Sequence, residues 1–180
     1  MRNLLLLLFS LITLLNSIHA EGASWISTPE NGANDENTWI AFRKDISLNK
    51  KPSKTIAHIA VDSKYWLWIN GEMAIFEGSL KRGPKPNASY YDEVDIAPYL
   101  HKGINKIAVL TWHFGKEGFS HKDSGKSGLY FDAPSIGLSS DSSWHALKHP
   151  AYQNCGDPKP NYRLPEANIR FNSNFDIPQW

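Results

Sequence analysis

Apolar and polar residues alternate in short runs along most of this chain. The runs are rich in β-branched and aromatic residues and are separated by Gly, Pro, Asn and Asp. No long stretch repeats its apolar positions with the 3.6-residue period of an amphipathic helix. The pattern therefore predicts an all-β fold built from short strands.

Several segments have the composition and length of strands. They are residues 39–46, 55–61, 64–69, 72–76, 90–96, 106–112, 128–133 and 143–147. A short helical turn is expected at 97–100. Residues 103–105 are expected to form a turn before the strand at 106–112.

The strand at 64–69 is expected to enter a tight hairpin. Asn70-Gly71 supplies the two residues of positive φ that a type I′ turn requires, so the chain should reverse into 72–76. Side chains alternate between the two faces of a strand. One face of 64–69 then carries Tyr65, Leu67 and Ile69, and the other carries Trp66 and Trp68.

The first 20 residues have the layout of a secretory signal peptide. Arg2 precedes the apolar run 4–15, and a short polar stretch ends at Ala20. The apolar run is shorter than the roughly 20 residues that a membrane-spanning helix needs. We expect cleavage after Ala20, export to the periplasm or the extracellular space, and no membrane span in the mature chain.

Removal of residues 1–20 leaves 160 of the 180 residues, which is enough for one domain with a sizeable core. It also removes Arg2, so 18 basic residues stand against 18 acidic ones. A neutral chain gives no electrostatic reason to bind nucleic acid. Cys155 is the only cysteine and is expected to be structural, because no His or cationic cluster adjoins it in the sequence.

From residue 149 onwards the chain turns to Pro, Asn and isolated aromatic residues. We therefore expect residues 21–150 to form the β domain. Residues 151–180 are expected to form a linker or arm outside the core.

Aromatic residues are abundant, with seven Trp, seven Tyr and eight Phe. Aromatic faces stack on the apolar faces of sugars or bury contacts between domains. The face of 64–69 that carries two Trp is either part of the core or a binding surface. Long loops beside strand ends commonly carry the binding sites of β-sandwiches. The candidate carbohydrate contacts are Trp66, Trp68, Tyr90, Tyr91, His113 and Lys126.

The acidic cluster at 92–95 raises the alternative of an independent glycosidase. Glu93 and Asp95 share one strand face, about 6.5 to 7 Å apart, which is compatible with either two-carboxylate mechanism. A general acid also needs an apolar pocket that raises its pKa, and the sequence reveals none. Exposed strand carboxylates are the favoured interpretation.

Two other motifs do not support a site. The segment 125–127 (Gly-Lys-Ser) lacks the upstream glycine of a phosphate-binding loop, because Ser120 stands in that place. His113 and His121 have neither zinc-site spacing nor a nearby carboxylate in the sequence, so they are expected to be solvated or core histidines.

Five segments of the chain carry a family resemblance. They are 23–27 (ASWIS), 37–46 (NTWIAFRKDI), 62–72 (DSKYWLWINGE), 90–100 (YYDEVDIAPYL) and 103–112 (GINKIAVLTW). In this order they resemble the N-terminal non-catalytic module of bacterial α-L-rhamnosidases. The segments 149–153 and 162–171 are similar to the stretch that leads from this module towards the rest of such enzymes. The resemblance implies a jelly-roll or galactose-binding-like β-sandwich beside a catalytic (α/α) barrel that hydrolyses terminal L-rhamnose.

The resemblance also implies where catalysis belongs. The family's catalytic acids lie in the barrel, and no position of this chain matches the motifs of that barrel. The implied function is a module that binds a rhamnose-containing glycan or helps to form the substrate site. A catalytic domain or subunit is the implied partner, towards which 151–180 would lead. The alternative is a purely structural domain that packs on such a partner. Sugar-binding β-sandwiches often hold calcium through loop oxygens, but the sequence does not locate a calcium site.

Overall fold

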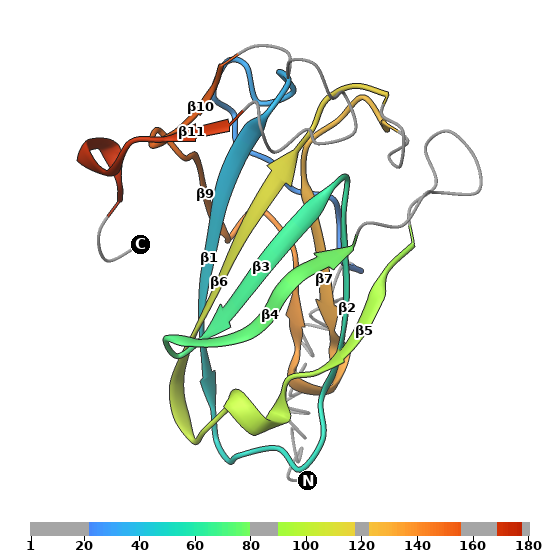
Figure 1. Cartoon of the computed structure of the whole chain (residues 1–180). Helices are drawn as coiled ribbons and strands as arrows, with labels where there is room; N and C mark the ends of the chain where they lie inside the picture. Colours follow the sequence, from blue (N-terminus) through green and yellow to red (C-terminus); the bar gives the residue numbers. More distant parts are fainter. Residues whose placement is uncertain (1–21, 80–89, 118–122, 156–168, 178–180) are drawn as a thin grey trace, which may run out of the picture.

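The computed structural model describes residues 22–79, 90–117, 123–155 and 169–177 (Figure 1). Two antiparallel sheets form its main body, and the predicted all-β sandwich is confirmed. The expected signal peptide at 1–20 lies outside the described residues. Within these residues, no helix has the length and apolar character needed to cross a membrane.

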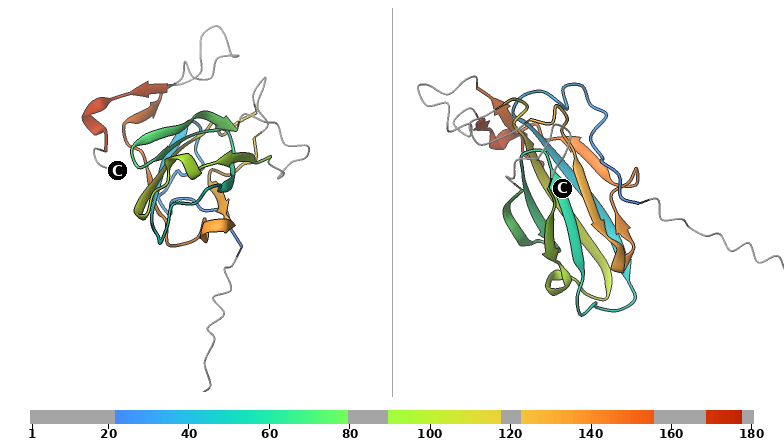
Figure 2. Two further views of the ribbon diagram at one scale, coloured as in Figure 1. Left: turned by 90° about the horizontal axis from the view of Figure 1, so that it is seen from below. Right: turned by 90° about the vertical axis from the view of Figure 1, so that its right-hand side faces the viewer.

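The two sheets of the sandwich differ in size. The first runs in the order β4 (Glu72–Ser79), β3 (Lys64–Ile69), β6 (Gly103–His113), β1 (Thr38–Leu48) and β9 (His145–Lys148). The second runs in the order β5 (Asp92–Asp95), β2 (Ile56–Val61), β7 (Leu129–Ala133) and β8 (Leu138–Ser139). Figure 2 shows the two layers from the end and from the side.

The core lies between these sheets and takes every second residue of each strand. Leu67 of β3, Ile107 of β6, Ile59 of β2 and Phe131 of β7 are fully buried in one cluster. Since side chains alternate along a strand, the residues between them face outwards. Each sheet therefore keeps one outer face on which a functional site can form.

The predicted hairpin is confirmed. β3 has the expected bounds, and both Asn70 (φ 54°) and Gly71 (φ 84°) have the positive φ of a type I′ turn. Trp66 and Trp68 are half-buried and lie on the outer face of the first sheet. They belong to a surface rather than to the core between the sheets.

Other boundaries differ from those expected. The turn expected at 103–105 is the start of β6, where Gly103 pairs with Leu48 of β1. Asn105 can lie inside a strand because its fully buried amide is satisfied locally: its Oδ1 accepts the His101 backbone N–H and its Nδ2 donates to the His101 carbonyl. The expected helical turn at 97–100 is present as η1 (Ala97–Tyr99). The expected strand at 143–147 is shifted to β9.

The C-terminal residues pack on the outer face of the first sheet. β10 (Tyr152–Asn154) pairs with β11 (Ile169–Phe171), and η4 (Ser173–Phe175) follows. Tyr152 stacks on Trp39 of β1 with ring centroids 4.0 Å apart, and Ala151 is fully buried. We call residues 151–155 and 169–177 the C-terminal arm, which appears at the upper left in Figure 1.

Candidate functional site

The outer face of the second sheet carries an open cavity of about 750 Å³. His58 and Ala60 of β2 and Tyr130 of β7 contribute from the sheet, because their neighbours along each strand point into the core. Residues outside the strands complete the lining. They are residues 25–28, Ala33, Asn34, Tyr91, Ser124, Lys126 and Ser127. A cavity of this size is within the range of small-molecule binding sites.

Four aromatic rings line this cavity, those of Trp25, His58, Tyr91 and Tyr130. Trp25 lies beside Tyr130, with centroids 6.2 Å apart and planes tilted by 48°. Tyr91 lies over His58 at 4.8 Å. Trp25 and Tyr91 are each 51% exposed, so a large part of each ring is open to a ligand.

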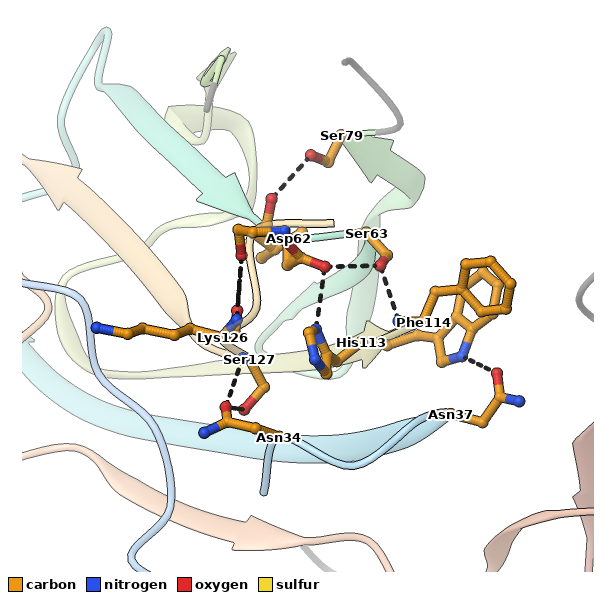
Figure 3. A network of polar contacts seen from close by, with 12 residues as sticks. Asn34, Asn37, Asp62, Ser63, Ser79, His113, Phe114, Lys126 and Ser127 are labelled. Carbon is orange, nitrogen blue, oxygen red and sulfur yellow. Dashed lines mark hydrogen bonds and ion pairs between the residues drawn. The ribbon is translucent and has the colours of Figure 1, made fainter. Parts of the chain in front are cut away.

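Polar groups occupy the loop side of the same cavity. The Oδ1 atom of Asn34 accepts the backbone N–H of Ser127 at 2.8 Å, which ties the segment before β1 to the loop before β7. The Ser127 hydroxyl is 3.1 Å from that of Ser27. Ser124 and Lys126 bridge each other through backbone and hydroxyl groups. In Figure 3 the Lys126 side chain extends away from the hydrogen-bonded network.

A buried histidine and aspartate lie behind this loop, where β2 and β6 end. The Nδ1 atom of His113 is 3.0 Å from Oδ2 of Asp62, and both side chains are at most 3% exposed. The Oδ1 atom of Asp62 accepts the backbone N–H of Ser124 at 3.0 Å. The hydroxyl of Ser63 donates to Asp62 and accepts the backbone N–H of Phe114 (Figure 3). The network therefore connects both sheets to the loop that lines the cavity.

The structure divides the six predicted carbohydrate contacts among three places. Tyr91 and Lys126 line the cavity of the second sheet. Tyr90 is 49% exposed beside it but does not line it. His113 is 2% exposed and faces Asp62, so a bound sugar would not reach it directly.

Trp66 and Trp68 lie on the opposite side of the sandwich. Trp66 stacks on Trp39 at 5.0 Å, and Trp39 in turn stacks on Tyr152, so Trp66 belongs to the docking surface of the C-terminal arm. Trp68 lines a second cavity of about 550 Å³, together with Arg43 and two residues from the C-terminal region, His149 and Ile177.

The two carboxylates of the glycosidase alternative have structural partners. The Oδ1 atom of Asp95 accepts the backbone N–H groups of Thr55 (3.0 Å) and Ala97 (3.1 Å). These two bonds hold the pKa of Asp95 below its usual value. Glu93 is 64% exposed and lies 3.5 Å from His58. A carboxyl with a lowered pKa is unsuited to act as a general acid at neutral pH, so Asp95 does not fit that role.

Sequence reasoning missed much of the cavity. Trp25, Asn34, His58 and Tyr130 are scattered over more than a hundred residues and meet through strand pairing and long-range loop contacts. The carboxylate beside His113 was missed for the same reason, because Asp62 lies 51 positions away. The sequence did contain one indication of the cavity. In their predicted strands, His58 and Tyr130 alternate with apolar residues, so both were expected on the outer face of the sheet.

Neither a scan against protein-family models nor a search of curated proteins found a match. Solved structures do match. The chain is similar to a GH78 family rhamnosidase of Bacillus sp. GL1, with 27% identity and a TM-score of 0.59 over 74% of this chain and 14% of that chain. An α-L-rhamnosidase from Aspergillus terreus matches with 19% identity and a TM-score of 0.52, over 72% of this chain and 17% of that one. The chain thus spans about one seventh of the Bacillus enzyme, and the predicted likeness to one β-sandwich module of α-L-rhamnosidases is confirmed.

Proposed function

We propose that this chain is a non-catalytic carbohydrate-binding module whose site is the cavity on the outer face of the second sheet. The observation that carries the proposal is the combination of half-exposed aromatic rings and a polar loop around one open cavity. Sugars present apolar ring faces and hydroxyl edges. The walls of this cavity offer a surface for each.

The aromatic wall is suited to the apolar face of a sugar. Trp25 and Tyr91 supply flat surfaces on opposite sides of the sheet residues His58 and Tyr130. Aromatic rings contribute both buried area and a directional contact with positively polarised C–H groups. The hydroxyl edge of the sugar would meet Asn34, Lys126 and the serines of the loop, which supply donors and acceptors.

The likeness to rhamnosidases supports a choice of ligand and partner. We infer that the ligand is a rhamnose-containing glycan, and that the module works beside a rhamnosidase catalytic domain or subunit. The signal-like residues 1–20 support export to the periplasm or the extracellular space. In this role the module holds substrate near a catalytic centre and needs no acid or base of its own.

Calorimetric titration of the purified chain with L-rhamnose and rhamnose-bearing oligosaccharides tests this function. A Trp side chain has about 250 Å² of surface, so the exposed half of Trp25 offers about 120 Å². If a sugar covers half of that area, the contact contributes about 1.5 kcal/mol at ~25 cal/mol per Å². Trp25→Ala should therefore raise Kd about 10-fold.

Trp68→Ala is the matched control, because it removes an outward-facing Trp of the first sheet, on the opposite side of the sandwich. It should leave Kd unchanged. A loss of affinity in Trp68→Ala but not in Trp25→Ala would place the sugar site on the first sheet and refute the proposed location. If no glycan binds the unaltered chain, the carbohydrate function is refuted and a structural domain packed on a partner takes its place. The exposed Phe76 (69%) and Met73 (46%) on β4 would then be the surface to test.

A further inference from the structure

Asp62, His113 and Asp123 come together behind the loop that lines the cavity. Asp62 follows β2, His113 ends β6, and Asp123 lies in the loop before β7. One ligand atom from each of the three residues lies within 4.8 Å of the others. A single ion with bonds of 2.0 to 2.4 Å spans about that separation.

Two buried atoms of this cluster have no hydrogen-bond partner in the part of the chain that the structure describes. Among the described residues, neither Nε2 of His113 nor Oδ1 of Asp123 has a hydrogen-bond partner, and both are shielded from solvent. His113 donates from Nδ1 to Asp62, which leaves Nε2 as a bare acceptor. A buried polar atom without a partner costs about 1 to 3 kcal/mol. Two acceptors cannot bond to each other, whereas a cation held between the three residues would give both a partner.

We propose that Asp62, His113 and Asp123 form a binding site for a divalent transition ion of the zinc or manganese class. His113 Nε2 and Asp123 Oδ1 supply direct ligands. Asp62 keeps the Nδ1–H of His113 and thereby fixes the tautomer and the orientation of the ring, as carboxylates commonly do for metal-bound histidines. Because imidazole nitrogen is a poor ligand for calcium, the chemistry selects a transition ion and not the calcium that the fold class suggested.

An ion at this site would also affect the cavity, because the site adjoins the loop that lines it. Asp123 adjoins Ser124, whose backbone N–H is bound by Asp62 at 3.0 Å and which lines the cavity with Lys126 and Ser127. An ion held by Asp123 would fix this loop from behind. Sugar affinity should then fall when the ion is removed. This second step rests on the proposed carbohydrate function, whereas metal binding itself does not.

Metal binding is tested by titrating the EDTA-treated and dialysed chain with Zn²⁺, Mn²⁺ and Ca²⁺ in separate calorimetric experiments. We expect one saturable site for Zn²⁺, with Ca²⁺ binding at least 10-fold more weakly. Asp123→Asn should weaken Zn²⁺ binding at least 10-fold, because it removes a charged ligand from a half-buried position.

Asp132→Asn is the matched control. Asp132 is also half-buried, but it lies on β7 and accepts the Ser139 hydroxyl outside the cluster. Its variant should bind Zn²⁺ as the unaltered chain does. Substitution with Co²⁺ adds a second readout, since a visible absorption band should appear in the unaltered chain and be lost in Asp123→Asn. If His113→Gln fails to fold, Asp123→Asn still decides the question.

Three results would overturn the site. They are no saturable binding of Zn²⁺ or Mn²⁺, stronger binding of Ca²⁺ than of Zn²⁺, or unchanged Zn²⁺ affinity in Asp123→Asn. Any of these results would mean that the His113–Asp62 contact is structural and binds no metal ion. Glycan binding is measured in a separate titration, with and without EDTA. A chain that binds sugar but no metal would therefore refute the metal site and leave the proposed carbohydrate function standing.

Discussion

Truncation of Tyr152 tests whether the C-terminal arm is held on the sandwich by its aromatic contacts. An isolated two-stranded sheet is at best marginally stable in water, so β10 and β11 need support from elsewhere. Tyr152 provides it, since the centroid of its ring lies 4.0 Å from that of Trp39 on β1 and 5.0 Å from that of Phe171 on β11. Tyr152→Ala removes the ring that joins the arm to the first sheet.

The size of the effect follows from how much of that ring is covered. Removal of a fully buried aromatic side chain costs about 3 to 5 kcal/mol. Tyr152 is half-buried, so about 2 kcal/mol is expected. This change raises the equilibrium constant for local opening of the arm about 30-fold, because 1.4 kcal/mol corresponds to a factor of ten.

Amide hydrogen exchange followed by mass spectrometry measures that opening directly. Peptides that cover Tyr152–Asn154 and Ile169–Phe171 should exchange about 30-fold faster in Tyr152→Ala, while peptides from β6 keep their protection. Phe175→Ala is the control, because Phe175 is an arm residue that is 51% exposed. Acceleration below about 3-fold, or equal acceleration in both variants, would show that other contacts hold the arm.

Two further variants test packing and protonation. Gly78→Ala should lower the free energy of unfolding by about 3 kcal/mol in urea titrations, since an added Cβ would overlap the fully buried ring of Tyr65. Gly71→Ala meets no atom and should cost only the roughly 1 to 2 kcal/mol of its positive φ, so equal losses would contradict the overlap. Burial holds the pKa of His149 below the 6.5 of a free histidine, although Asp176 acts in the opposite direction. The unfolded chain then binds more protons below about pH 6.5, so the melting temperature should fall as pH drops from 7 to 5, and this fall should be smaller in His149→Gln.

Features set by neighbouring residues were predictable from the sequence. The Asn70-Gly71 turn depends on the φ preferences of two adjacent residues, and the faces of β3 follow from strict alternation along six residues. The helical turn at η1 was expected for similar local reasons. In each case the residues that decide the local structure lie within a few positions of one another. A single sequence is therefore enough to predict it.

Features set by strand pairing were not predictable in this way. The order of the strands determines that His58 of β2 lies beside Asp132 of β7, and no local pattern encodes that pairing. His113 was expected to be a solvated or core histidine because no carboxylate is close to it in the sequence. It is buried, and it has Asp62 as a partner. Asp62 reaches it because β2 and β6 end at the same end of the sandwich, where β3 pairs with β6 at Lys64 and Trp112 (Figure 1).

The two outer faces of the sandwich differ in what covers them, and this difference decides which aromatic residues can test the proposed sugar site. On the first sheet, the rings of Trp66, Trp39 and Tyr152 form a continuous stack with the chain's own C-terminal arm. A substitution of Trp66 therefore disturbs the docking of the arm, and a change in sugar affinity there would have two explanations. On the second sheet, Trp25 and Tyr91 keep half of their surface open around the cavity. Truncation of Trp25 would therefore test the proposed sugar contact while leaving in place the stack that holds the C-terminal arm.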